Sequence, residues 1–156
     1  MISTMKGAYT LIIEVEKDFD IEIQSLGEVR FQSGIWAYVG SAMGSGSTSL
    51  ENRIKRHFRS QKKIHWHIDY LLARDAKLVK AFWAESPVHI ECDIAQKIQT
   101  RDEFQIGPKN FGSSDCQKGC SAHIFRFLDV GNVDEAIREV FNAVGLESSI
   151  TTDGNL

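Results

Sequence analysis

Residues 34–41 read Gly-Ile-Trp-Ala-Tyr-Val-Gly-Ser, and a loop rich in glycine and serine joins them to residues 50–57, Leu-Glu-Asn-Arg-Ile-Lys-Arg-His. The first segment is rich in aromatic and β-branched residues, which is typical of a strand, and it ends at Gly40. Thr48 and Glu51 match a capping box. We therefore expect the second segment to be a helix that begins at about residue 48.

The expected helix carries two stripes of side chains. Leu50, Ile54 and Phe58 recur every four residues and form the side that should be buried. Arg53 and His57 are also four residues apart, so they lie one above the other on a neighbouring face. A tyrosine near a strand end, a flexible loop and this Arg/His pair make a corner that could hold a phosphate.

Length and composition indicate one globular domain. The chain has 156 residues with ordinary hydrophobic and charged fractions, which suits a single core. We predict one domain over residues 1–146 and a polar, frayed tail over residues 147–156. No apolar run approaches the roughly 20 residues needed to span a bilayer, and residues 1–7 lack the pattern of a secretion signal. We expect a cytoplasmic protein with no membrane association.

The charge is unevenly distributed. The net charge of −3 argues against nucleic acid, but residues 52–68 contain no acidic residue. The basic residues of this stretch are Arg53, Lys55, Arg56, Arg59, Lys62 and Lys63. A local basic patch on an acidic protein can hold a phosphate backbone. The alternative is that Lys62 and Lys63 only solvate a helix end, where cations suit the dipole.

The remaining pattern predicts strands and helices in alternation. We expect strands at 9–15, 21–24, 29–39 with a bend near Gly34, 77–84 and 122–128, with 21–24 folding back as a hairpin. Helices are expected at 65–74, from Pro87 through a stripe of Ile90, Ile94 and Ile98, and at 134–144. Residues 40–49 and 104–114 are expected to be loops. The elements indicate an α/β fold of the α+β type.

Two tripeptides and the helix pair occur in a recognisable order: Gly7-Ala8-Tyr9, Tyr38-Val39-Gly40 and Arg53-x-x-x-His57. This set resembles the signature of the GIY-YIG nucleases. The chain is most similar to the Uri-type, GIY-YIG-like branch, seen mostly in archaea and some bacteria. Further matching segments are 38–42, 56–57, 65–71, 91–92 and 112–116, so the resemblance covers about residues 7–128.

The resemblance implies a small, mainly antiparallel sheet flanked by helices, and an endonuclease that hydrolyses phosphodiester bonds with one Mg²⁺ or Mn²⁺ ion. Its catalytic positions match Tyr9, Tyr38, Arg53 and His57, and its metal ligand matches Glu91. A tyrosine near the attacking water can relay a proton. Because a free tyrosine has a pKa near 10, it needs a nearby cation, and Arg53 can also stabilise the phosphate charge. A carboxylate suits a hard cation such as Mg²⁺.

Two features differ from the family pattern. An extra hairpin separates the two tripeptides, which keeps its ends adjacent. Ser41 follows the second tripeptide where the more active members carry lysine or another polar donor, so one cation is missing. The residues assigned to nucleic-acid binding are Ser41, Lys55, Arg56, Arg59, Lys62, Lys63, His65 and His67. We expect DNA rather than RNA as the partner. His65 and His67 have an alternative role in a structural network with Asp69.

Three cysteines and one histidine suggest a second metal. Cys92, Cys116, Cys120 and His123 supply a Cys₃His ligand set for zinc, and Asp115 is a further candidate ligand or a second acid near Glu91. The alternative is a group of buried free thiols. Three functional hypotheses follow: a metal-dependent endonuclease, a nucleic-acid-binding module of the same fold with little or no catalysis, or a zinc-stabilised interaction domain.

Overall fold

The computed structural model describes residues 2–113, 116, 118–128 and 131–156. Its centre is a six-stranded sheet in the order β6-β7-β4-β1-β5-β8, in which every neighbouring pair is antiparallel. These strands are β1 (Gly7–Val15), β4 (Gly34–Ala42), β5 (Ala76–Glu85), β6 (Phe104–Ile106), β7 (Ile124–Phe127) and β8 (Ser149–Thr151). The predicted mixed fold with a mainly antiparallel sheet is confirmed.

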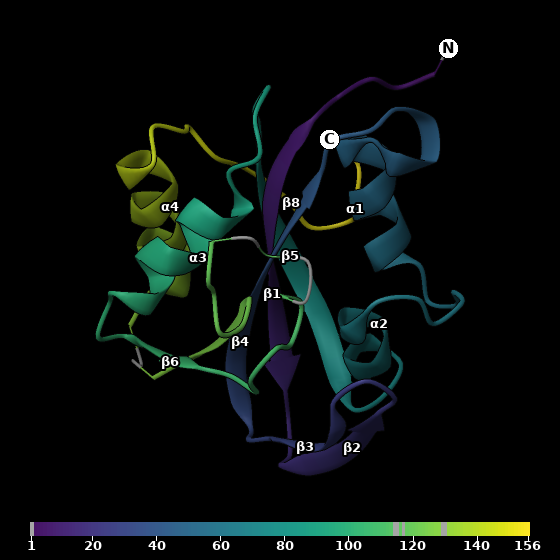
Figure 1. Cartoon of the computed structure of the whole chain (residues 1–156), viewed down its shortest axis with the longest axis vertical. Coiled ribbons are helices and arrows are strands. Elements are labelled where there is room, and N and C mark those ends of the chain that lie inside the picture. Colours follow the sequence, from purple (N-terminus) through teal and green to yellow (C-terminus); the bar gives the residue numbers. More distant parts are fainter. Residues whose placement is uncertain (1, 114–115, 117, 129–130) are drawn as a thin grey trace.

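Helices cover both faces of the sheet. The helices are α1 (Leu50–Phe58), α2 (His67–Leu72), α3 (Glu91–Gln99) and α4 (Val133–Ala143), with a short 3₁₀ turn, η1 (Gly46–Thr48), before α1. Figure 1 shows α1 and α2 on one side of the strands and α3 and α4 on the other. No helix in the described ranges is long and apolar enough to cross a membrane.

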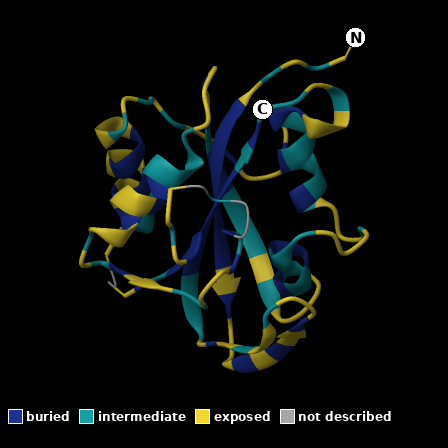
Figure 2. Ribbon diagram, in the orientation of Figure 1, coloured by how far each residue is buried: buried dark blue, intermediate teal, exposed yellow. Residues whose placement is uncertain are grey.

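The side chains of β1 alternate between the two layers, because successive residues of a strand point to opposite faces. Tyr9, Leu11 and Ile13 pack in the core that includes α1 and α2. Ala8 and Ile12 pack in the core that includes α3 and α4. Figure 2 shows that β1 is buried over most of its length. The sheet therefore separates two apolar cores, and Tyr9 belongs to the α1 side.

The register of the central strands leaves one edge of β4 uncovered. In the β1–β4 pair, Tyr9 lies opposite Gly40. On its other edge β4 pairs with β7 only over Ile35–Tyr38, followed by a hydrogen bond from the Val39 N–H to the His123 carbonyl, 2.8 Å. Among the described residues, no strand pairs with this edge at residues 40–42. A pocket can open there beside the end of β7.

The extra hairpin forms a sheet of its own. β2 (Phe19–Ile23) pairs with β3 (Gly27–Phe31). Residues 21–24 thus do not fold back on the first strand as expected. One bent strand was expected over residues 29–39, but residues 29–31 and 35–39 belong to different sheets. Gly34, at the start of β4, has a φ of +134°. Glycine adopts this conformation without strain.

Four other boundaries differ from the predictions. Ser49, not Thr48, caps α1, since its hydroxyl accepts a hydrogen bond from the Asn52 N–H; the Thr48 hydroxyl instead donates to the Ser45 carbonyl. α3 begins at Glu91 rather than at Pro87. Part of the expected 104–114 loop is strand β6. The expected 40–49 loop includes the end of β4 and the turn η1.

The C-terminal residues are ordered rather than frayed. β8 pairs with β5 through Ser149–Thr151. Thr151 and Gly154 are buried, and Leu156 packs against the core that includes α1. Polar composition suggested a frayed end, but the backbone of a short edge strand is satisfied by pairing, which composition does not reveal.

Candidate active site

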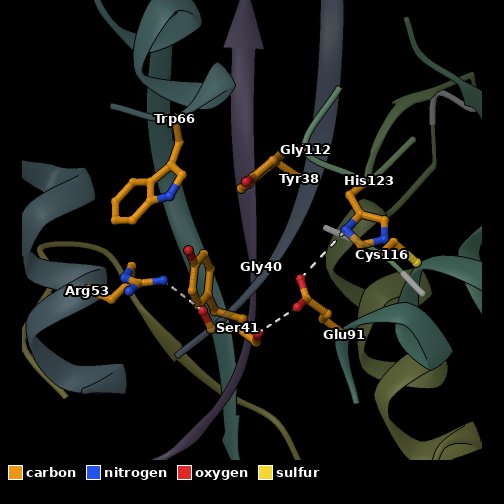
Figure 3. A pocket seen from close by; sticks show the side chains of 10 residues that line it. Tyr38, Gly40, Ser41, Arg53, Trp66, Glu91, Gly112, Cys116 and His123 are labelled. Atoms are coloured by element: carbon orange, nitrogen blue, oxygen red, sulfur yellow. Dashed lines mark hydrogen bonds and ion pairs between the residues drawn. The ribbon is translucent and has the colours of Figure 1, made fainter. Parts of the chain in front are cut away.

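A pocket of about 160 Å³ opens at the uncovered edge of β4. It is lined by Tyr9, Tyr38, Gly40, Ser41, Arg53, Trp66, Glu91, Gly112, Cys116 and His123. Figure 3 shows Arg53 and Glu91 on either side of Ser41. The structure thus brings together both tyrosines, the arginine and the carboxylate that the sequence suggested. They come from two neighbouring strands, β1 and β4, and from two helices on opposite faces of the sheet, α1 and α3.

Arg53 enters the pocket from α1. One guanidinium nitrogen donates a hydrogen bond to the Ser41 carbonyl, 3.0 Å. The guanidinium carbon lies 4.4 Å from the centre of the Trp66 ring, a cation–π contact. Its Nε is buried and has no hydrogen-bond partner among the described residues. An oriented guanidinium with unused donors is suited to bind an oxyanion.

Glu91 enters the pocket as the first residue of α3. Its Oε1 accepts a hydrogen bond from the Ser41 hydroxyl, 2.7 Å, and its Oε2 lies 3.6 Å from His123 Nδ1. Burial tends to raise the pKa of Glu91, but His123 and the Ser41 hydroxyl outweigh burial and lower it below its usual value. The carboxylate is therefore ionised at neutral pH and retains acceptor sites for a cation.

The Tyr9 side chain forms a buried pair with His57. Tyr9 Oη lies 2.8 Å from His57 Nε2. Burial raises the pKa of Tyr9, and Arg53 only partly offsets this, so Tyr9 is a neutral phenol. Burial also lowers the pKa of His57 to about 3, so its imidazole is neutral and has one ring nitrogen that can accept a hydrogen bond. His57 lies behind Tyr9 and does not line the pocket.

Two glycines leave room for the tyrosine rings. A Cβ on Gly40 would lie 2.5 Å from Tyr9 Oη, and a Cβ on Gly112 would lie 2.6 Å from the Tyr38 ring. Gly112 also has a φ of +72°, and its N–H donates to His67 Nδ1, 2.9 Å. Burial raises the pKa of Tyr38 well above its usual value. The second tripeptide and the Gly112 loop thus pack together around both phenols.

Several residues assigned to nucleic-acid binding have structural contacts. Arg56 forms two hydrogen bonds with the buried Asp69 carboxylate, 2.9 and 3.0 Å, and a third with the Lys63 carbonyl. Lys62 donates to the carbonyls of His57 and Arg59 at the end of α1, as the helix-end alternative proposed. These contacts leave Arg56 and Lys62 fewer donors for a phosphate.

The remaining residues of the basic stretch are closer to solvent. Arg59 and Lys63 are exposed, and Lys55 pairs with Glu51 one helical turn away. His65 is exposed and packs edge-on against Trp66, with ring centres 4.6 Å apart. His67 Nε2 contacts the hydroxyl of Ser25, in the turn between β2 and β3, at 2.7 Å. Since His67 Nδ1 accepts from the Gly112 N–H, the ring joins the β2–β3 hairpin to the loop that contains Gly112. Asp69 accepts hydrogen bonds from the backbone N–H groups of His65 and Trp66.

The buried Asp69 carboxylate allows a stability prediction. Burial tends to raise its pKa, but bonds from Arg56 and the backbone outweigh burial and lower it below its usual value. Because the folded pKa is depressed, this stabilisation is present above pH 4 and disappears as pH falls through the folded pKa. We expect Asp69→Asn to lower the free energy of unfolding by about 3 kcal/mol at pH 7. Urea denaturation measures it.

The matched control for this variant is Asp75→Asn, which changes an exposed carboxyl just beyond α2. It should change the free energy of unfolding by less than about 0.5 kcal/mol. Between pH 4 and pH 2 the difference between wild type and Asp69→Asn should shrink, as Asp69 itself becomes protonated. A difference that stays constant as the pH falls would contradict the assigned role of the Asp69 carboxylate.

A second cluster borders the pocket. The ligand atoms of Cys92, Cys116, Cys120 and His123 all lie within 4.8 Å of one another, a grouping that could hold a metal ion. Three sulfurs and an imidazole form a zinc-type ligand set. The Cys92–Cys116 sulfur distance is 2.7 Å, and Cys92 Sγ lies 3.7 Å from His123 Nε2. The candidate ligand Asp115 lies outside the described residues.

The environment of the cluster favours at least one thiolate. Burial tends to raise the pKa of Cys116, but hydrogen bonds from Cys92 and backbone N–H groups outweigh it and lower the pKa to about 6. Burial raises the pKa of Cys92 and of Cys120. A thiolate is the form that binds a metal.

Trp66 is the pocket residue that sequence reasoning missed. Its ring lies against both Arg53 and Arg56, at 4.4 and 4.6 Å from the guanidinium carbons. The flanking histidines drew attention instead, although an aromatic ring beside two basic helical residues is itself a signal for stacking. The contact of His123 with Glu91 was also missed, because sequence spacing does not show that one imidazole can face two sites.

Comparison with family models finds one match: the model described as "Domain of unknown function DUF123" covers residues 8–146. The chain therefore belongs to the DUF123 family. Comparison with curated proteins and with solved structures found no match.

Proposed function

We propose that this member of the DUF123 family is a metal-dependent endonuclease of the GIY-YIG type, which hydrolyses phosphodiester bonds in nucleic acid. The supporting observation is that Tyr9, Tyr38, Arg53 and Glu91, which come from four elements, line one pocket of about 160 Å³. The pocket is polar and large enough for a phosphate group with bound water. DNA is the substrate we favour.

The donor set of the pocket fits one hard divalent cation. Mg²⁺ is commonly held by one or two carboxylates together with water and substrate phosphate oxygens. Glu91 is the one carboxylate among the described residues that line the pocket, and it would hold the ion. A bound Mg²⁺ or Mn²⁺ would polarise the phosphate and lower the pKa of nearby water.

Each remaining residue has a role that its contacts support. Arg53 binds the phosphate oxygens, since its guanidinium is oriented by Ser41 and Trp66. Tyr9 positions the attacking water with its hydroxyl, which the neutral His57 holds in place through Nε2, 2.8 Å away. Tyr38 orients the water from the neighbouring strand. His57 thus orients the Tyr9 phenol in a site that has Ser41 instead of a lysine.

A cleavage assay tests this function. The full chain is incubated with branched, single-stranded and duplex DNA and with RNA, in the presence of Mg²⁺ or Mn²⁺. We expect cleavage that falls about a hundredfold in Arg53→Lys, because lysine cannot reproduce the fork of donors. The matched control is Arg59→Lys, an exposed arginine that follows α1, which should remain within threefold of wild type.

Equal cleavage by the wild type and Arg53→Lys would indicate a contaminating nuclease and contradict the proposal. Salt-sensitive binding without any cleavage would favour the second candidate, a nucleic-acid-binding module. The exposed Arg59 and Lys63 support that candidate, because exposed cations can contact the phosphates of a nucleic acid. Such contacts release counterions, so the binding should weaken as the salt concentration rises. Substituting both with alanine would then weaken binding and reduce its salt dependence.

We further propose that the cysteine cluster holds zinc and that the protein works in the cytoplasm. For ideal bond lengths, a sulfur and a nitrogen bound to the same tetrahedral zinc lie about 3.6 Å apart, close to the 3.7 Å between Cys92 Sγ and His123 Nε2. Two sulfurs on one zinc lie about 3.8 Å apart, so the Cys92 and Cys116 sulfurs, now at 2.7 Å, would move apart by about 1 Å when the ion binds. A reducing compartment keeps such thiols available for metal.

A further inference from the structure

We infer that Glu91 acts at both metal sites: it holds the divalent cation in the pocket, and it orients His123, a ligand of the zinc cluster. The zinc cluster and the nuclease pocket are therefore joined through the His123 imidazole. Figure 3 shows Glu91 between Ser41 and His123, with Cys116 beyond the histidine. The inference rests on the proposed function for its consequence, but the contact itself does not depend on nuclease activity.

The two ring nitrogens of His123 face different groups. Nε2 is 3.7 Å from Cys92 Sγ in the cluster, whereas Nδ1 is 3.6 Å from Glu91 Oε2. The side chain is 2% exposed, and Nδ1 has no hydrogen-bond partner within the described part of the chain. A buried polar atom without a partner is costly. Glu91 is the nearby acceptor to which this nitrogen can donate after a small movement.

The backbone holds His123 where it can make both contacts. Its N–H donates to the Phe111 carbonyl, and its carbonyl accepts from the Val39 N–H, each at 2.8 Å. The first bond anchors the cysteine-bearing loop, and the second anchors β4 beside the pocket. The imidazole is therefore fixed between the two sites.

Zinc chemistry determines which nitrogen carries the proton. A zinc ion on Nε2 requires the proton to be on Nδ1, which faces Glu91. Metal-bound histidines almost always donate this second N–H to a carboxylate, a carbonyl or water. Glu91 would then accept one hydrogen bond on each oxygen, from Ser41 and from His123. Each carboxylate oxygen accepts more than one bond, so a site remains for Mg²⁺.

The consequence is a carboxylate oriented from two sides. Ser41 fixes Glu91 from β4, and His123 fixes it from the cluster. In zinc-free protein the proton of His123 can occupy either nitrogen, and the second of these contacts is no longer assured. His123 is thus a positioning residue for the nuclease site, in addition to being a zinc ligand.

Zinc affinity measured by competition with a chromophoric chelator tests the inference on the full chain. We expect Glu91→Ala to weaken zinc binding by about 10- to 100-fold, the usual effect of losing such a partner. The matched control is Asp93→Ala. Asp93 lies in the same first turn of α3 and forms an ion pair with Lys118 at 2.9 Å. Lys118 lies between the ligands Cys116 and Cys120 in the sequence. It should change zinc affinity by less than threefold.

Proton NMR of ¹⁵N-labelled protein gives a second readout. In the zinc-loaded wild type, His123 should show a slowly exchanging Nδ1 proton, and this proton should exchange rapidly in Glu91→Ala. Glu91→Gln, which keeps an acceptor oxygen, should retain the signal and serves if the alanine variant does not fold. Zinc affinity in Glu91→Ala equal to that of Asp93→Ala would overturn the inference. A protein that shows the coupling but never cleaves nucleic acid would refute only the nuclease proposal.

Discussion

Glu91→Gln should reduce nucleic-acid cleavage at least about a thousandfold, which corresponds to about 4 kcal/mol of transition-state stabilisation. The change keeps the size of the side chain and an oxygen that can accept from the Ser41 hydroxyl, 2.7 Å away in the wild type. It removes the negative charge in the pocket on which divalent cation binding depends. A neutral amide oxygen is a much weaker ligand for Mg²⁺ in a site that otherwise relies on water and substrate.

The assay should be run with saturating zinc, so that any loss is due to the pocket and not to the cysteine cluster. Electron paramagnetic resonance of Mn²⁺ then measures the pocket ion directly, and we expect the wild type to bind Mn²⁺ and Glu91→Gln not to bind it in the same concentration range. Asp93→Asn removes the same charge from the same helical turn and should behave as wild type in both measurements. Undiminished cleavage by Glu91→Gln would exclude Glu91 as the metal ligand.

The composition of the pocket could be predicted where it depends on local rules. The four-residue spacing of Arg53 and His57 predicted that both lie on one face of α1, and in the structure this face is turned toward Tyr9. The strand pattern gave β1 and β4, whose antiparallel register then sets Tyr9 opposite Gly40. The resemblance supplied Glu91. What the sequence could not show is that His57 lies behind Tyr9 and that only Arg53 of the pair reaches the pocket.

The features that escaped prediction depend on contacts distant in sequence. Arg56 looked free to bind phosphate, but Asp69, thirteen residues later, accepts two of its hydrogen bonds. The strand β8 forms by pairing with the edge of β5, and its short polar sequence does not predict this pairing. The cap of α1 is a local exception: Thr48 and Ser49 are both residue types that cap helices, and the structure selects Ser49, whose hydroxyl accepts from the Asn52 N–H. Residue spacing predicts which side chains lie together on one helix or strand. It does not predict which residue from another element each of them contacts.

Removing zinc should have the largest effect on stability. The cluster joins Cys92 on α3 to Cys116, Cys120 and His123, which belong to the segment that carries Phe111 into the core and Gly112 against Tyr38. A ligand present at a thousand times its dissociation constant stabilises the folded state by about 4 kcal/mol. For a chain of this length, that loss corresponds to a fall in Tm of roughly 10 °C.

Protein purified without chelator should contain about one equivalent of zinc by elemental analysis. Thermal denaturation followed by circular dichroism, in reducing buffer, should show the lower Tm after chelation, and zinc but not Mg²⁺ should restore it. Cys120→Ser should reproduce the chelated state, whereas Ser121→Ala, which changes an exposed side chain next to it, should not. Less than a tenth of an equivalent of zinc, or a Tm unaffected by chelation, would show that the thiols are free. The ordered Gly112 loop would then be supported by its protein contacts alone, including the hydrogen bond from the Gly112 N–H to His67.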